Sequence, residues 1–211
     1  MRICKIFGID FYLTIGFFVF AGLVAFSGPE TMWFYSMLYL FVLVHEFCHA
    51  LTAKHLGYNV PRIELNILGG IAYINNLIKA TAKDELLIIG AGPFSNLMFA
   101  LEFFVLDWFF PSKAITTLMN MNLFLVVFNL IPMAPLDGNK ILKSLLYMKH
   151  NDKLRAIQTS YAVGVGSTGF ALAFAIYFQQ FNMCFFFLLV SLMGYVEYRG
   201  SVAFIENREN R

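Results

Sequence analysis

Residues 32–49 of the chain read MWFYSMLYLFVLVHEFCH, an apolar run that ends in ionisable side chains. The part from Met32 to Val44 contains no charged residue, and His45, Glu46 and His49 follow it directly. An α-helix needs roughly 20 predominantly apolar residues to cross a bilayer. Ionisable side chains inside such a helix are costly and usually have a function. The stretch therefore predicts a membrane helix that carries a polar site.

The composition of the whole chain is typical of a membrane protein. Of its 211 residues, 59% are hydrophobic, 18% are aromatic and 13% are charged, and the mean hydropathy is +0.69. Soluble domains have about 25% charged residues. No basic patch with interleaved aromatic residues suggests nucleic acid, so we expect no nucleic-acid partner. The 3 cysteines lie far apart in or next to apolar segments, and we expect them to be free thiols.

The polar breaks between apolar segments predict an all-α polytopic membrane protein with about six transmembrane helices. The expected spans are Ile9–Phe26, Met32–Thr52, Asp84–Phe110, Ile115–Ile131, Tyr161–Phe178 and Met183–Tyr198. With the N-terminus inside, all of the 15 Lys and Arg residues except Lys113 fall on the inner side. The positive-inside rule then places both termini and the polar motifs toward the cytoplasm. An alternative for the first span is a cleaved signal peptide, which would leave the other spans unchanged.

The pattern His45-Glu46-x-x-His49 has the spacing of a zinc site. On an α-helix, two histidines four residues apart point from nearly the same face, so both can bind one metal ion. Glu46 follows the first ligand and can take a proton from a water on the metal as a general base. The alternative is two interfacial histidines and a glutamate that reaches the membrane surface. Burial in lipid argues against that alternative, because the three groups would be costly without a partner.

Two residues are candidates for a third metal ligand. His55 stands where the longer pattern H-E-x-x-H-x-x-G-x-x-H has its last histidine, but Thr52 replaces the glycine that turns that chain. On a continuing helix, His55 would lie about 240° around the axis from His49. Asp137 is the better candidate, since it follows a segment with two prolines that would interrupt the fourth span beside a polar cavity. The alternative for Asp137 is a simple helix cap at the membrane exit.

Three motifs on consecutive spans together resemble the site-2 proteases, a family of polytopic intramembrane metalloproteases. They are His45-Glu46-x-x-His49, Gly92-Pro93-Phe94-Ser95-Asn96 and Asn129-x-x-Pro132-x-x-Pro135-Leu136-Asp137-Gly138, and the resemblance covers about Phe11 to Leu146. It implies one zinc ion per chain, bound by His45, His49 and Asp137, with Glu46 as the general base. Asn96 and Asn129 match family asparagines near the active site. Each could donate to a substrate carbonyl, or form a hydrogen bond between helices.

The segment Asn66–Ile74, which contains Gly69 and Gly70, is too short and too rich in glycine for another crossing. It looks like the family's re-entrant β-hairpin between the second and third membrane helices. An exposed strand edge could pair with an unwound substrate and keep its backbone groups hydrogen-bonded. The alternative is an amphipathic surface loop.

We therefore predict a single membrane-embedded metalloprotease domain over residues 1–211, with a catalytic core at about 32–146 and a C-terminal helix pair at about 160–198. The resemblance implies an intramembrane zinc endopeptidase that cuts within or next to a transmembrane segment, in regulated intramembrane proteolysis or signal-peptide clearance. The alternatives are a membrane metal transporter with the same ligands and a non-cleaving binder of membrane segments. The expected partners are a transmembrane substrate and the lipid bilayer of a prokaryotic plasma membrane, and a regulatory membrane partner is left open. We expect no PDZ or CBS-type domain in a sequence of this length.

Overall fold

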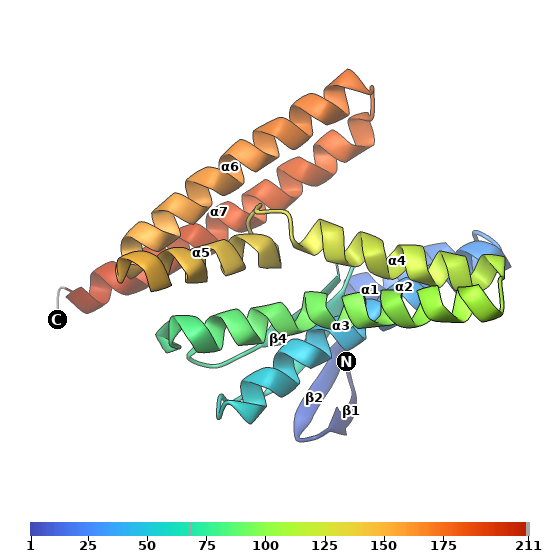
Figure 1. The fold of residues 1–211 in the computed structure, drawn as a ribbon, viewed down its shortest axis with the longest axis horizontal. Coiled ribbons are helices and arrows are strands. Elements are labelled where there is room, and N and C mark those ends of the chain that lie inside the picture. The colour runs from blue at the N-terminus through green and yellow to red at the C-terminus, as the bar shows by residue number, and fades with distance from the viewer. Residues whose placement is uncertain (68, 210–211) are drawn as a thin grey trace. The chain divides into compact units, whose positions relative to one another are not determined.

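The computed structural model of the protein describes residues 1–67 and 69–209. Leu68, which belongs to the predicted hairpin segment, lies outside the described residues, as do residues 210 and 211. The described chain is mostly helical and contains one four-stranded sheet (Figure 1). The elements are β1 (Arg2–Ile6), β2 (Ile9–Leu13), α1 (Ile15–Ala25), α2 (Pro29–His55), β3 (Arg62–Asn66), β4 (Gly69–Tyr73), the 3₁₀ turn η1 (Leu77–Lys79), α3 (Ala82–Phe109), α4 (Lys113–Asn129), α5 (Asp137–His150), α6 (Lys153–Tyr177) and α7 (Phe181–Glu209).

The chain divides into two compact units. Unit 1 comprises Met1–Ala80 and Gly90–Val126, and unit 2 comprises Thr81–Ile89 and Val127–Arg211. Helix α3 contributes its first turns to unit 2 and the rest to unit 1, and the last residues of α4 belong to unit 2. The single domain expected over residues 1–211 stays a prediction.

The sheet belongs to unit 1 and has the order β1-β2-β3-β4. Strands β1 and β2 pair antiparallel, β2 and β3 pair parallel, and β3 and β4 form an antiparallel hairpin between α2 and α3. The N-terminal strands β1 and β2 correct the expectation that the fold outside the predicted hairpin segment is all-α. Alternating residues of β2 and β3 are buried, namely Ile9, Phe11, Ile63 and Leu65. This period of two is the signature of a strand with one buried face.

The expected first span, Ile9–Phe26, is not a continuous helix. Its first residues form β2, and its remainder forms α1, which has 11 residues. The Thr14 side chain caps α1 by accepting a hydrogen bond from the Phe17 N–H at 3.4 Å. At 1.5 Å per residue α1 is about 16 Å long, well short of the ~30 Å hydrocarbon layer.

Four helices in the described part of the chain are long and apolar enough to cross a membrane: Pro29–His55, Ala82–Phe109, Lys153–Tyr177 and Phe181–Glu206. Helix α4, which corresponds to the expected fourth span, has 17 residues. The protein is thus an integral membrane protein by the length and composition of its helices.

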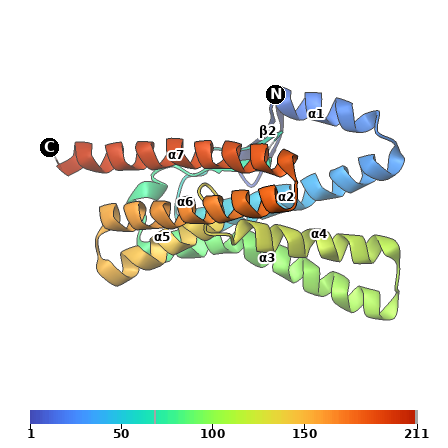
Figure 2. The same cartoon turned by 90° about the horizontal axis from the view of Figure 1, so that it is seen from above.

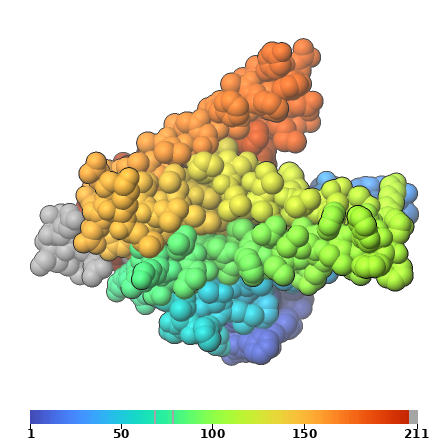
Figure 3. Space-filling model, viewed as in Figure 1, coloured from blue at the N-terminus to red at the C-terminus, as the bar shows by residue number. Residues whose placement is uncertain are grey.

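Helix α2 forms the framework of unit 1. It begins at Pro29, a favourable first position because proline has no N–H to leave unpaired. It continues without interruption through His45 and His49 to His55. The Phe41 ring is buried and packs against Phe99 and Phe103 of α3. The side chains of α3 and α4 cover one face of this unit side by side (Figure 3).

In unit 2, α5, α6 and α7 pack in sequence, and α6 and α7 run antiparallel beside each other (Figures 1 and 2). The Asn139 amide of α5 donates to the Ser160 carbonyl of α6 at 2.6 Å. The Lys143 ammonium forms an ion pair with Glu85 at 2.6 Å, and the Glu85 side chain is only 3% exposed. This ion pair ties α5 to the first turn of α3.

Candidate active site

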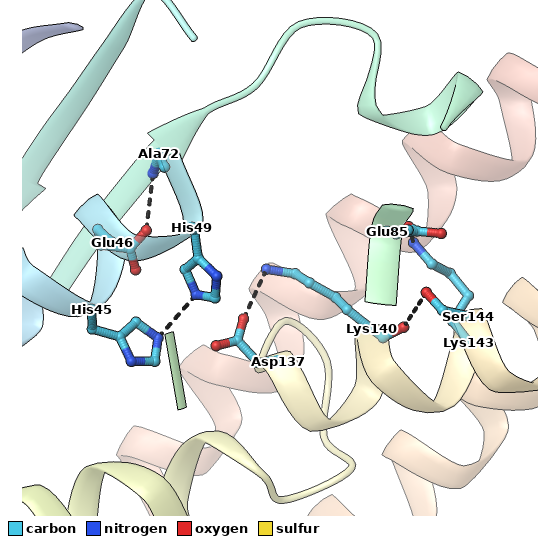
Figure 4. Close-up of polar contacts among 9 residues, drawn as sticks. All are labelled: His45, Glu46, His49, Ala72, Glu85, Asp137, Lys140, Lys143 and Ser144. Atoms are coloured by element: carbon cyan, nitrogen blue, oxygen red, sulfur yellow. Dashed lines mark hydrogen bonds and ion pairs between the residues drawn. The ribbon is translucent and has the colours of Figure 1, made fainter. Parts of the chain in front are cut away.

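The two histidines of the H-E-x-x-H motif lie on successive turns of α2 and are buried, with exposed fractions of 4% for His45 and 7% for His49. Their Nε2 atoms are 3.1 Å apart, and the ring planes are inclined at 87° (Figure 4). Two metal-ligating nitrogens therefore converge on one point inside unit 1. This is the arrangement that the spacing predicts for two ligands of one metal ion.

The space beside these nitrogens depends on a glycine of α3. A Cβ atom at Gly92 would lie 2.6 Å from the Nε2 atom of His45 and closer still to that of His49. No real side chain tolerates that proximity, so only glycine leaves the two nitrogens accessible at this position. Two imidazole nitrogens 3.1 Å apart are ligands of the kind that zinc accepts, and glycine at position 92 leaves room for both rings.

The other ring nitrogen of His45 is held by an amide from α3. His45 Nδ1 and Asn96 Oδ1 are 2.6 Å apart, and Asn96 is fully buried. The Asn96 Nδ2 group donates to Asn122 Oδ1 of α4 at 2.9 Å. Sequence reasoning identified Asn96 but missed Asn122. The available signal was an asparagine inside an apolar helix, since a buried amide requires partners.

Glu46 is half-buried and directed toward the sheet rather than toward the histidine rings (Figure 4). Its Oε2 atom accepts a hydrogen bond from the backbone N–H of Ala72, on edge strand β4, at 3.0 Å. A Cβ atom at Gly70 would overlap Glu46 Cγ and lie 3.2 Å from Leu65 Cδ2. Glycine at this position therefore allows β4 to lie directly against the carboxylate-bearing turn of α2.

In unit 2, Asp137 is the first residue of α5 and is buried, with an exposed fraction of 7%. Its carboxylate lies 3.8 Å from the ammonium of Lys140, one turn further along the helix. The N-cap position of α5 is Leu136, which makes no side-chain hydrogen bond to the helix. Asp137 is the first helical residue after it and is therefore not the cap residue. His45, His49 and Asp137 are all buried, and each offers a ligand atom of a kind that zinc accepts.

The remaining predicted site residues lie in both units. Asn129 is the last residue of α4 and is half-buried. Gly69 begins β4 with a φ of +134°, a backbone conformation that favours glycine. The competing ligand candidate, His55, is exposed at the last position of α2. The cysteines Cys4, Cys48 and Cys184 are free thiols, as expected.

Comparison with known proteins identifies the family to which this chain belongs. A model of Peptidase family M50 matches residues 33–116 and 110–176. The chain belongs to peptidase family M50, which confirms the resemblance to the site-2 proteases. The family and the two converging imidazoles together identify zinc as the metal cofactor.

Individual relatives agree with this assignment. The chain is 30% identical over 207 residues to a zinc metalloprotease of Methanocaldococcus jannaschii, a match that covers 92% of this chain and 58% of that protein. It is 31% identical over 107 residues to stage IV sporulation protein FB of Bacillus subtilis, covering 50% of this chain and 37% of that one. The solved structure of a site-2 protease from Methanocaldococcus jannaschii is similar, with a TM-score of 0.72, 26% identity and 94% coverage of both chains. The chain spans about half the length of the first curated relatives it matches.

Proposed function

We propose that the protein is an intramembrane zinc-dependent endopeptidase that hydrolyses a peptide bond within or next to a transmembrane segment of a membrane-protein substrate. The observation that carries this proposal is the pair of buried Nε2 atoms, 3.1 Å apart, on a helix long and apolar enough to cross the bilayer. A carboxylate, Glu46, stands on the same turn. Two metal-binding nitrogens beside a potential base are the minimal equipment of a metal-dependent hydrolase.

In the proposed reaction, Glu46 is the general base. Zinc, when bound, supplies a Lewis acid that polarises a carbonyl and lowers the pKa of water to about 7. The Glu46 carboxylate takes the proton of the attacking water and returns it to the departing amine nitrogen. Glu46 Oε2 accepts a hydrogen bond from the backbone of β4. The carboxylate therefore lies beside the strand with which we propose that the substrate pairs.

We propose that Asp137 is the third ligand and that one zinc ion is bound per chain. Catalytic zinc sites have three protein ligands and an open position. Asp137 supports the proposal because it is a buried carboxylate at the start of α5, whereas the competing His55 is exposed. The Lys140 ammonium lies 3.8 Å from this carboxylate and offsets part of its negative charge.

For the substrate backbone we propose pairing with β4, which is an edge strand of the sheet. An extended segment added to this edge keeps its backbone groups paired in a region without water, and exposes its carbonyls to attack. Gly69 and Gly70 add no side chains of their own to this strand, which lets β4 lie close to α2. Asn129 would donate its amide to a substrate carbonyl or to the developing oxyanion. Asn96 uses both ends of its amide in contacts with His45 and Asn122.

We further propose six membrane crossings with both termini in the cytoplasm of a prokaryotic cell, and a re-entrant position for the β3–β4 hairpin. The charge distribution supports this topology, because only Lys113 among the 15 Lys and Arg residues would lie outside. In this arrangement α1 and α4 would be the two remaining membrane crossings, in addition to the four longer helices. The shortness of α1 requires local thinning of the bilayer or burial of its ends against protein.

The test uses the full chain in detergent, with zinc stoichiometry and cleavage of a panel of single-span substrates measured on the same samples. Glu46→Gln should retain one zinc ion and lose cleavage about 10²–10⁴-fold, the usual contribution of a general base. Asp137→Ala should bind zinc more weakly. Glu102→Gln, the same change at an exposed glutamate of α3, is the matched control and should behave as wild type.

Cleavage that persists in purified Glu46→Gln would refute the assignment of the base. Unchanged zinc affinity in Asp137→Ala would refute the third ligand. A zinc-loaded wild type that cuts no member of the panel would count against proteolysis itself.

A further inference from the structure

We propose that Asn122 is a positioning residue of the metal centre: it orients the amide of Asn96, and thereby fixes the proton of His45 on Nδ1 and leaves Nε2 to bind the metal. The inference rests on the proposed metal site but not on the identity of any substrate. Asn122 lies outside the three motifs that resemble the site-2 proteases. Its amide lies two hydrogen bonds away from the histidine ring, within unit 1.

The three side chains form a continuous chain of hydrogen bonds in the interior of unit 1. His45 Nδ1 is 2.6 Å from Asn96 Oδ1, Asn96 Nδ2 donates to Asn122 Oδ1 at 2.9 Å, and Asn122 Nδ2 donates to the Leu118 carbonyl at 2.9 Å. Asn96 and Asn122 each have an exposed fraction of 0%. Water is thus excluded from both amides, and their orientation is decided by these protein partners.

The far end of this chain determines its direction. An asparagine amide can be turned over, which exchanges its donor and acceptor ends. A backbone carbonyl can only accept, so Asn122 must present its NH₂ group to Leu118 and its oxygen to Asn96. Asn96 must then present its NH₂ group to Asn122 and its oxygen to His45. The ring nitrogen that faces this oxygen must carry the proton.

The consequence reaches the metal ligand. A neutral imidazole with its proton on Nδ1 has its lone pair on Nε2. Nε2 is the atom of His45 that lies 3.1 Å from Nε2 of His49 and close to Gly92. A second hydrogen-bonded partner that fixes the tautomer of a ligand histidine is a general feature of metal sites, and its loss costs 10–100-fold in metal affinity or activity.

A purely structural role is the competing explanation, since the Asn96–Asn122 hydrogen bond also joins α3 to α4. A second substitution, at position 96, distinguishes the positioning role from the structural role. An amide has one acceptor end and needs Asn122 to decide which end faces His45. A carboxylate at position 96 accepts with either oxygen, so it would hold the His45 N–H without help. A mere link between helices would not be restored by such a change.

The experiment measures the rate of zinc loss to a chelator from the purified full chain. Asn122→Leu should raise this rate about tenfold or more. Asn120→Leu, the same change at an exposed position of the same helix, is the matched control and should leave it unchanged. In the Asn96→Asp background, adding Asn122→Leu should have little further effect on zinc loss. Equal zinc loss from Asn122→Leu and Asn120→Leu, or an undiminished effect in the Asn96→Asp background, would overturn the proposal.

A spectroscopic measurement on the wild type keeps the proposal testable if a variant fails to fold. The chain has 4 histidines, so ¹⁵N-histidine labelling gives few side-chain signals to assign. We expect His45 to carry its proton on Nδ1 both without metal and with zinc bound. A proton on Nε2, or metal bound through Nδ1, would refute the inference while leaving proteolysis intact. The expected tautomer and zinc kinetics in a protein that cuts no substrate would instead refute the proposed function alone.

Discussion

Replacement of Gly92 by alanine should empty the metal site without unfolding the protein. The new Cβ atom would lie 2.6 Å from His45 Nε2, whereas ordinary contacts begin at 3.4 Å. The nitrogen would have to retreat by about 0.8 Å, and metal–ligand distances tolerate only about 0.2 Å. His49 would be displaced further. We therefore expect a loss of zinc affinity of at least about 100-fold, equivalent to about 2.7 kcal/mol.

The assay is competition for zinc with a chelator of known affinity, combined with thermal unfolding of the same sample. Alanine is favoured over glycine inside a helix by about 1 kcal/mol, so Gly92→Ala should not lose stability through its backbone. Gly90→Ala is the matched control, because nothing lies within 4 Å of a Cβ atom at that position on the same helix. Zinc affinity of Gly92→Ala within threefold of Gly90→Ala would refute the reasoning.

Two further predictions concern the edge strand and the ion pair of unit 2. Gly70→Ala should reduce cleavage by tenfold or more with zinc content unchanged, because its Cβ atom would displace Glu46; full activity with normal zinc would contradict this. Lys143→Met should lower the free energy of unfolding by about 3 kcal/mol, because it leaves the Glu85 carboxylate, whose side chain is 3% exposed, without its partner. Thermal unfolding in detergent measures the loss. Adding Glu85→Gln should restore part of it, and a wild-type melting temperature for Lys143→Met alone would contradict the assigned role of the ion pair.

The helix that carries His45 and His49 could be predicted from the sequence because its signals are local. A long apolar run gives the membrane helix, and the four-residue spacing gives the shared face. Both follow from the repeat of a single helix. The structure has this helix without interruption past Thr52, which is why His55 is not turned back toward His49.

The N-terminal region was predicted wrongly because its apolar residues fit two structures. Hydrophobicity alone assigns residues 9–13 to the first span. Asp10 lies between the apolar residues Ile9 and Phe11, however, and this alternation also fits a strand. Short apolar runs cannot be assigned to helix or strand by hydrophobicity alone. Thr14, an N-cap residue, was the local sign that a helix starts after this point.

The contacts of Asn96 and Glu46 could not be predicted, since they join residues far apart in the chain. Asn96 meets Asn122 of another helix, and Glu46 meets the backbone of Ala72. A backbone N–H leaves no trace in the residue type, so no motif could have indicated the second contact. Gly70 belongs to the predicted hairpin segment and Gly92 to a family motif, but the need for glycine at each position follows only from the side chains that a Cβ atom would contact.

The parallel pairing of β2 with β3 has a consequence for the order in which unit 1 assembles. Asp10 pairs with Arg62 and Leu13 with Leu65, so these partners are separated by the whole of α1 and α2. The β1–β2 hairpin is local and can form early, but long-range strand pairing is slow because its loop must close first. During synthesis, one edge of β2 therefore cannot pair with β3 until α1, α2 and β3 have left the ribosome. We expect a chain arrested before residue 62 to expose that edge to other nascent chains and to aggregate more readily than the full chain.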